Sequence, residues 1–297
     1  MTKVGFIGIG HMGLGMCRNI LKGAFTVTGY DSAEAAMARL VDTGGQSASS
    51  AGEAAKDADF IITMLPNGAI VEDVFFAPGG IAEMMNAGAL AIDMSTILPT
   101  DTDRIRGRLA ERGLSMMDAP VGRTATEAET GKLLIMAGGT PEQVEQARPL
   151  FACMGDTIVH CGPAGSGARM KLINNYMTTV SNVVTAETLT LAKACGIELD
   201  VALGVMRGTA AGRGHMNTTY PDKILKNDLT PGFMIQLARK DLLLALETAD
   251  DTGVPIKTGR AALDLYDLAT AQGWGARDWT AMLRVVDDRV AKAAKAS

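Results

Sequence analysis

The residues best suited to chemistry stand together in the segment GSGARMKLINNYMTT. Four polar residues share one face of an expected helix, because they occupy positions i, i+3, i+4 and i+7: Lys171, Asn174, Asn175 and Thr178. A lysine on a mostly apolar face has three donors, and burial lowers its pKa readily. Its ammonium can protonate a carbonyl oxygen while hydride reaches the carbon, which is general acid catalysis. The alternative is a solvated stripe whose lysine reaches out to water, and the helical pattern alone leaves both open.

A glycine motif near the N-terminus indicates a dinucleotide site. Gly8, Gly10 and Gly13 have the spacing GxGxxG, after an expected strand and at the start of an expected helix. Glycines here permit a tight turn and let a pyrophosphate approach the backbone N–H groups at the helix start, beside His11 and Met12. The motif alone is a weak signal, and its position between a strand and a helix makes it informative.

The next expected strand ends at TGYD, so Asp31 lies where a carboxylate accepts hydrogen bonds from the adenosine ribose hydroxyls. A carboxylate would repel a 2′-phosphate, and no arginine stands beside it in GYDSAEAA. The sequence therefore predicts NAD (NADH) as the cofactor in preference to NADP. The alternative is a glycine-rich turn and a turn aspartate without a ligand.

Two further strand ends suit the same cofactor, because ligands of open α/β sheets bind beyond the carboxyl ends of the strands. In TMLPNG, Leu65 and Pro66 are expected to pack along the dinucleotide. In DMSTILP, Ser95 and Thr96 can reach the nicotinamide or the substrate. Capping of the following helix explains Ser95 and Thr96 equally well.

These residues depend on elements of two kinds. Up to about residue 160, short apolar strands alternate with helical segments, which predicts a mostly parallel, doubly wound α/β sheet. The expected strands are KVGFIGI, FTVTGYD, DFIITML, ALAIDMS, LSMMDAP, KLLIMAG and DTIVHC. A helix of nearly thirty residues then runs to Gly196, and the remainder reads as all-helical, divided by GTAAGRGH, LTPG and TGVP. We predict a Rossmann-type NAD-binding domain at 1–162 and an all-α domain for the substrate and for oligomerisation at 163–297.

Composition limits the classes of function. The chain has 297 residues, 47% of them hydrophobic, with scattered basic residues and a net charge of −5, which argues against a nucleic-acid-binding surface. The apolar runs are too short to span a bilayer. Four cysteines and three histidines show no metal-ligand spacing, so no metal is expected. The chain enters a strand at its first residues, so we expect no signal peptide, reduced thiols and a cytoplasmic location.

Four motifs in this order resemble the β-hydroxyacid dehydrogenase family over nearly the whole chain: GFIGIGHMGLGM, DAPVGRT…ETGKLLIMAGG, GSGARMKLINN and ARKDLLLAL. The resemblance implies reversible, NAD(P)-linked oxidation of a 3-hydroxy acid to its semialdehyde. It implies that Lys171 is the catalytic acid/base and that Asn175 helps to position it. It also implies that Lys240, in ARKDL, borders the cofactor.

One loop departs from the family pattern. After DxPV, relatives usually have Ser-Gly-Gly, whose small residues hold a substrate carboxylate, whereas this chain has Gly122, Arg123 and Thr124. A sulfonate is larger than a carboxylate and has three oxygens. An arginine fork and a hydroxyl suit it, with Asn174 and Thr178 available from the expected helix. The alternative is that Arg123 faces solvent or an interface.

The wider pattern, including KLINNYM and GTAAGRGH, resembles the branch of the family that reduces 3-sulfolactaldehyde from sulfoquinovose breakdown to 2,3-dihydroxypropane-1-sulfonate. The expected partners are therefore a small anionic aldehyde and further copies of the chain, as a homodimer or homotetramer, with no nucleic acid and no membrane. Two other readings remain. One is a carboxylate semialdehyde reductase acting on tartronate, succinic or methylmalonate semialdehyde, and the other is a non-catalytic dinucleotide-binding scaffold.

Overall fold

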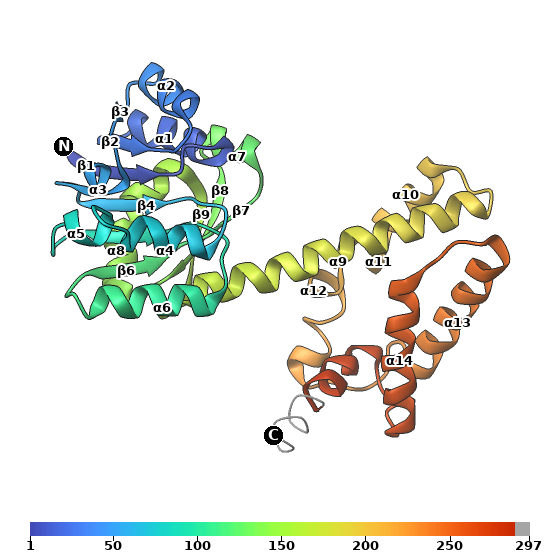
Figure 1. Ribbon diagram of the computed structural model, residues 1–297. Coiled ribbons are helices and arrows are strands. Elements are labelled where there is room, and N and C mark those ends of the chain that lie inside the picture. The colour runs from blue at the N-terminus through green and yellow to red at the C-terminus, as the bar shows by residue number, and fades with distance from the viewer. Residues whose placement is uncertain (289–297) are drawn as a thin grey trace. The chain divides into compact units, whose positions relative to one another are not determined.

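The computed structural model describes residues 1–288 and contains two compact units (Figure 1). The first unit comprises Met1–Tyr176 and the second begins at Met177. The helical pattern of the sequence predicts the long helix α9 (Ser166–Ala194), which starts in the first unit and ends in the second.

The first unit is built on a nine-stranded sheet with the order β3-β2-β1-β4-β5-β6-β8-β7, and β9 pairs with β8. Its strands are β1 (Thr2–Ile7), β2 (Phe25–Tyr30), β3 (Gln46–Ser47), β4 (Phe60–Thr63), β5 (Leu90–Asp93), β6 (Ser115–Asp118), β7 (Val121–Gly122), β8 (Leu133–Gly138) and β9 (Gly155–Gly162). The first six strands are parallel and have the Rossmann order, whereas β8 pairs antiparallel with β6 and β7. All seven expected strands are present. The sequence analysis missed β3 and β7, because two residues are too few to show an apolar pattern.

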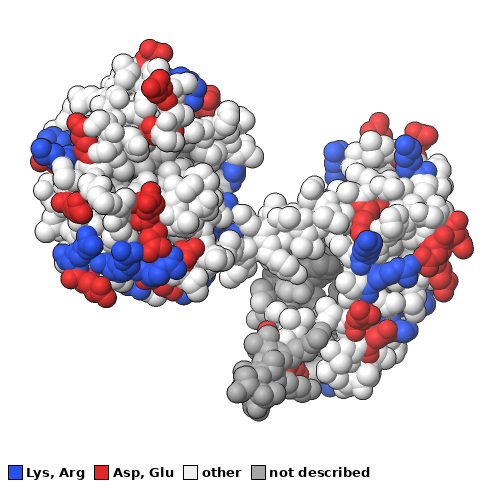
Figure 2. Space-filling view, in the orientation of Figure 1, with Lys and Arg blue, Asp and Glu red and all other residues white. Residues whose placement is uncertain are grey.

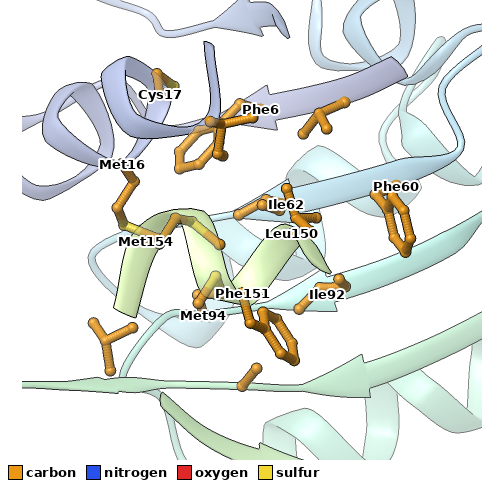
Figure 3. Packing of buried hydrophobic residues seen from close by; sticks show 14 of the residues in the cluster. Phe6, Met16, Cys17, Phe60, Ile62, Ile92, Met94, Leu150, Phe151 and Met154 are labelled. Atoms are coloured by element: carbon orange, nitrogen blue, oxygen red, sulfur yellow. The ribbon is translucent and has the colours of Figure 1, made fainter. Parts of the chain in front are cut away.

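Buried hydrophobic clusters cover both faces of this sheet. Side chains along the strands alternate between the two clusters. Phe6 and Ile62 belong to one buried cluster, whereas their neighbours Ile7 and Ile61 belong to another. Successive side chains of a strand point to opposite faces, so these clusters are the two sides of one sheet. Figure 3 shows the first side, where Leu150 and its neighbours from α8 (Pro141–Met154) lie over the strands.

Six further helices cover the sheet and its edges: α1 (His11–Lys22), α2 (Glu34–Asp42), α3 (Ala51–Ala55), α4 (Gly68–Phe76), α5 (Ile81–Met84) and α6 (Pro99–Ala110). The short helix α7 (Ala125–Thr130) packs against α1. Lysine, arginine and acidic side chains intermix on the surface of this unit (Figure 2). On α6, Arg104 and Arg108 both pair with Glu72 of α4, at 2.6 and 2.5 Å.

The second unit is helical, as predicted for the C-terminal part. After α9 it contains α10 (Leu199–Gly208), α11 (Ala210–Arg213), α12 (His215–Thr218), α13 (Ile235–Thr252) and α14 (Lys257–Ala271), with short 3₁₀ turns η1 (Ile224–Lys226) and η2 (Trp279–Ala281). The segment GTAAGRGH, expected to be a divider, contains the short helix α11. Among the described residues, no helix is both long and apolar enough to cross a bilayer.

Candidate active site

The glycine motif forms a close turn between β1 and α1. A Cβ added to Gly8, whose φ is 101°, would lie 2.2 Å from the Met64 carbonyl oxygen. A Cβ on Gly13 would lie 2.0 Å from the Gly8 carbonyl oxygen. Gly10, in contrast, borders open space, with no atom within 4 Å of an added Cβ. The turn therefore packs α1 closely against β1. It also leaves room for a phosphate group at the N-terminus of α1, which begins with His11 and Met12.

Asp31 lies directly after β2 and faces this turn. Its Oδ2 accepts a hydrogen bond from the Ile9 N–H at 2.8 Å, and its Oδ1 accepts one from the Ala33 N–H at 2.9 Å. It lines a pocket of about 360 Å³ that also includes Gly8, Gly10, Leu65 and Pro66. Five predicted cofactor-binding residues thus meet in one pocket, which fits the adenosine half of a dinucleotide.

The sequence analysis missed the other wall of this pocket. Ile70, Asp73 and Val74 line it from α4. These residues come after the loop TMLPNG in the sequence. They lie beside Asp31 only because α4 packs on the sheet, which the sequence pattern does not show.

A buried polar network joins the ends of β4 and β5. The Asp93 Oδ1 accepts hydrogen bonds from the Thr63 hydroxyl at 2.8 Å and from the Ser95 N–H at 3.1 Å. The Ser95 Oγ in turn accepts one from the Leu65 N–H at 2.9 Å. Burial raises the pKa of the Asp93 carboxyl. The Ser95 side chain therefore has a structural role, because it binds the backbone of the loop that carries Leu65.

Thr96 is exposed, unlike Ser95. It lines a pocket of about 470 Å³ together with Asn67 and Leu172. Leu172 is the neighbour of Lys171 on α9, so this pocket lies between the end of β5 and the helix that carries the candidate acid.

Lys171 lies in the second turn of α9 and is partly buried. Burial lowers the pKa of its ammonium. Because α9 is continuous from Ser166 to Ala194, the four polar residues predicted to share a face do share one. Asn175 is partly buried, whereas Asn174 and Thr178 are exposed, and the Asn174 amide donates a hydrogen bond to the Asn175 Oδ1 at 3.4 Å.

Arg123 adopts a backbone conformation that favours glycine, with φ at 74°. Its guanidinium donates hydrogen bonds to the Lys132 carbonyl oxygen, to Asp156 Oδ1 at 2.7 Å and to Thr157 Oγ1 at 3.2 Å. None of these partners was a predicted site residue. The left-handed conformation suits the glycine that the family pattern leads us to expect at this place.

The residues beside Arg123 have structural partners too. Gly122 is buried, and a Cβ there would lie 3.6 Å from Leu134. Thr124 is the N-cap of α7 and forms a capping box, in which its hydroxyl lies 2.6 Å from Glu127 Oε2. Helix capping therefore accounts for Thr124 without a substrate.

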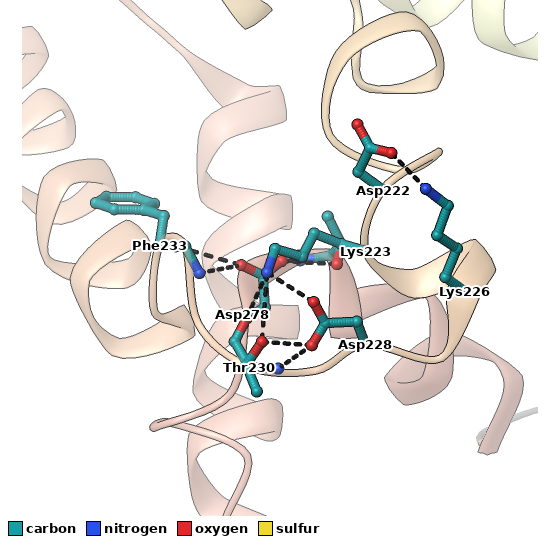
Figure 4. A network of polar contacts seen from close by, with 9 residues as sticks. Asp222, Lys223, Lys226, Asp228, Thr230, Phe233 and Asp278 are labelled. Atoms are coloured by element: carbon teal, nitrogen blue, oxygen red, sulfur yellow. Dashed lines mark hydrogen bonds and ion pairs between the residues drawn. The ribbon is translucent and has the colours of Figure 1, made fainter.

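Lys240 belongs to α13 in the second unit, where it is exposed and lies 3.2 Å from Asp241. The loop before α13 is held by a polar network around the buried Asp278 (Figure 4). The Asp278 Oδ2 accepts hydrogen bonds from the Gly232 and Phe233 N–H groups at 2.8 and 3.2 Å. This network fixes the start of the helix that carries Lys240.

The glycine turn, the aspartate after β2 and the partly buried lysine define the class of this site. Together they have the groups that an NAD-dependent oxidoreductase needs: a cradle for the pyrophosphate, an acceptor for ribose hydroxyls and a proton donor. No described group of three or more His, Cys, Asp or Glu side chains could hold a metal ion.

Comparisons with known proteins agree with this class. The model of the NAD binding domain of 6-phosphogluconate dehydrogenase matches residues 3–162. The model of the NAD-binding domain of NADP-dependent 3-hydroxyisobutyrate dehydrogenase matches residues 165–286. The chain is 47% identical to 3-sulfolactaldehyde reductase of Escherichia coli (strain K12), over 96% of both chains. It is 37% identical to NAD-dependent L-serine dehydrogenase of Pseudomonas aeruginosa, over 97% of this chain and 98% of the relative.

Solved structures show the same likeness. The 3-hydroxyisobutyrate dehydrogenase of Mycobacterium tuberculosis, in a structure with L-serine, has a TM-score of 0.68 and 31% identity, over 96% of this chain and 99% of that one. An imine reductase from Myxococcus stipitatus, in complex with NAD⁺, has a TM-score of 0.87 at 16% identity, over 96% and 99%, which shows a shared fold. The chain belongs to the β-hydroxyacid dehydrogenase family, the family of 3-hydroxyisobutyrate dehydrogenase, and it is an NAD-dependent oxidoreductase.

Proposed function

We propose that this enzyme reduces 3-sulfolactaldehyde to 2,3-dihydroxypropane-1-sulfonate with NADH, as a step of sulfoquinovose breakdown. The observation that carries the proposal is Arg123 at φ 74°, in a loop where the family pattern leads us to expect glycine. A non-glycine residue in this conformation costs of the order of 1–3 kcal/mol, and such strain is concentrated at functional sites. The 47% identity to the 3-sulfolactaldehyde reductase of Escherichia coli supports the same substrate.

The guanidinium of Arg123 has five N–H donors in a planar fork. Its hydrogen bonds to the protein involve Nη1 and Nη2. The fork keeps donor capacity for an anion, and the exposed position of Arg123 allows access from solvent. In the proposed complex the sulfonate oxygens are held by Arg123, with Gly122, Thr124, Asn174 and Thr178 completing the anion site and Thr96 lying between substrate and cofactor.

The proposed mechanism assigns the proton to Lys171. When bound, NADH supplies the hydride that reduces the aldehyde carbon. The ammonium of Lys171 donates a proton to the carbonyl oxygen, so that the alkoxide does not accumulate. Partial burial lowers the pKa of Lys171, which brings the group closer to neutral pH, where proton transfer works best. Asn175, one residue from Asn174 on α9, orients the ammonium, and Lys240 borders the cofactor as the family resemblance implies.

A carboxylate semialdehyde is the second candidate substrate. Two observations favour it. Arg123 forms an ion pair with Asp156, and Thr124 forms the capping box of α7, so both residues have structural roles that require no sulfonate. The likeness to an L-serine dehydrogenase points the same way. In that case Arg123 fastens the loop to β9 and the anion is held elsewhere.

Comparing turnover of 3-sulfolactaldehyde with that of its carboxylate analogue separates the two candidates. We expect kcat/KM for the sulfonate to exceed that for the carboxylate by at least about tenfold, which corresponds to about 1.4 kcal/mol. Equal or better turnover of the carboxylate would reject the sulfonate assignment.

We further propose that the enzyme is a cytoplasmic homodimer or homotetramer, as in the family it resembles. Light scattering of the purified protein, measured together with its elution volume, gives the number of subunits. A monomer at micromolar concentration would contradict this proposal.

A further inference from the structure

Asp118, the last residue of β6, is a buried carboxylate to which the proposed reaction gives no role. Its side chain is 1% exposed. Its Oδ1 accepts a hydrogen bond from the Gly165 N–H at 2.5 Å, and its Oδ2 accepts one from the Ala168 N–H at 2.7 Å. The Gly167 N–H also stabilises the ionised form, against the effect of burial, which raises the pKa of Asp118. The carboxylate thus receives the backbone donors at the very start of α9.

These donors belong to the turn that precedes the candidate acid. Helix α9 begins at Ser166, and Lys171 follows Ala168 by three residues, so one helical turn separates the anchored N–H from the lysine. The first N–H groups of a helix have no partner within the helix. At a buried helix start, a carboxylate satisfies them and also interacts favourably with the positive end of the helix dipole.

Close backbone contacts hold the same turn against the sheet. A Cβ on Gly167 would lie 2.2 Å from the Met136 carbonyl oxygen and 2.9 Å from Asp118 Oδ2. A Cβ on Gly138 would lie 2.6 Å from the Gly167 nitrogen. The absence of side chains at both positions lets α9 start directly on the ends of β6 and β8, within reach of Asp118.

We propose that Asp118 is a positioning residue, which sets the height and rotation of the first turns of α9 and so places the Lys171 ammonium at the carboxyl edge of the sheet. This inference rests on the proposed role of Lys171 as the proton donor. It assigns Asp118 no contact with substrate or cofactor. Since a displacement of about 1 Å in a reacting group can cost about a hundredfold in rate, a small shift of α9 is sufficient to slow the proton transfer.

The test is Asp118→Asn. The amide keeps the shape of the side chain but turns an NH₂ group toward a buried N–H donor, so one of the two anchors is lost. We expect kcat to fall about 10- to 100-fold, with NADH binding stoichiometry unchanged and KM for NADH within about twofold. The primary isotope effect on kcat, measured with NADH deuterated at the transferred position, should rise because the chemical step becomes slower. A loss of folded enzyme alone would lower kcat and leave the isotope effect unchanged.

The matched control is Asp103→Asn. Asp103 contacts the same turn of α9 through Arg169, at 2.6 Å, but this pair is exposed and pairs of that kind contribute little. The same substitution there should change kcat by less than about twofold. A comparable loss in both variants would show that any disturbance of this turn has the same effect, and would reject the special role of Asp118.

A double-mutant comparison isolates the path through Lys171. In a Lys171→Ala background, Asp118→Asn should change the residual rate by less than about twofold, because the group it positions is gone. The same fold loss in both backgrounds would overturn the proposal. If Lys171→Ala alone kept near-full activity, the proposed mechanism would fail, whatever Asp118→Asn did. The assays use 3-sulfolactaldehyde and its carboxylate analogue in parallel, so a wrong substrate assignment is recognised separately.

A second variant, Asp118→Ser, removes the charge and shortens the side chain by one bond, so its hydroxyl falls short of the Gly165 and Ala168 N–H groups. Its kcat should be no higher than that of Asp118→Asn, and a kcat near that of the wild type would overturn the proposal. If both variants fail to bind NADH and fail to unfold cooperatively, Asp118 is required for folding, and the positioning role is rejected.

Discussion

Arg123 and Asp156 form an ion pair, with 2.7 Å between Nη1 and Oδ1, although they are 33 residues apart in the sequence. The pair joins the loop after β7 to the start of β9. Thr157, the third partner in this contact, pairs in register with Leu134 of β8, so its side chain shares the face of the sheet on which Leu134 lies. Leu134 and Asn174 line one pocket. The guanidinium of Arg123 and Asn174 of α9 therefore border the same side of the sheet.

Arg123→Gly separates anion recognition from support of the loop. We expect kcat/KM for 3-sulfolactaldehyde to fall at least tenfold, because a charge-assisted hydrogen bond contributes about 1.5–3 kcal/mol. Activity toward a small uncharged aldehyde should fall far less. Equal losses for both aldehydes would mean that Arg123 supports the loop and does not bind the substrate.

The same variant should cost little stability. Glycine adopts φ 74° without strain, and this offsets the loss of an ion pair whose side chains are 37% and 47% exposed. We expect the melting temperature to change by no more than a few degrees. A large decrease would show that the pair with Asp156 is a main support of β9.

Lys171→Ala should lower turnover by about 10²–10⁴-fold, the usual contribution of a positioned acid or base. NADH binding should change little. Lys193→Ala, a substitution of the same kind near the other end of α9, serves as the control and should have no comparable effect on turnover. If the Lys171 variant kept near-full activity, another group would have to supply the proton.

The pH dependence of kcat should report the lowered pKa of Lys171. Reduction of the aldehyde needs the ammonium, so its rate should fall as the pH rises through a pKa below the usual lysine range. Oxidation of the alcohol needs the neutral amine as base, so its rate should rise over the same range. In Lys171→Arg the side chain stays charged, and the alkaline loss of reduction should disappear from whatever activity remains. Persistence of that loss in the arginine variant would assign it to a different group.

Asp31→Ala tests cofactor choice. The wild-type enzyme should strongly prefer NADH to NADPH, since the Asp31 carboxylate would repel a 2′-phosphate. The variant should bind NADH more weakly and show a narrower gap between the two cofactors. Glu34→Ala, which removes a nearby acid in the first turn of α2, is the control and should leave the preference unchanged. Equal use of both cofactors by the wild-type enzyme would contradict the assignment.

The sequence by itself determined the architecture and brought out most residues of the candidate dinucleotide site. Alternating apolar strands and helices predicted the parallel sheet, and the helical spacing from Ser166 onward predicted α9. Gly8, Gly10, Gly13 and Asp31 were found because their spacing along the chain is itself the signal: a turn between one strand and one helix, then the end of the next strand.

Only the tertiary structure decided which side chains meet across that sheet. Asp118 and the Gly165 N–H are 47 residues apart, and nothing in the spacing of either shows that β6 ends where α9 begins. Ser95 and Thr96 are neighbours, and the sequence makes both equally good candidates for the site. In the structure Ser95 is buried in a hydrogen-bond network, whereas Thr96 lines a pocket. The partners of Arg123 are Lys132, which precedes β8, and two residues of β9, and the backbone pairing of β7 with β8 and of β8 with β9 brings them to Arg123. The spacing of apolar residues along the chain shows whether a segment is a helix or a strand. The contacts of a side chain depend on which elements pack together, and this is a property of the whole fold.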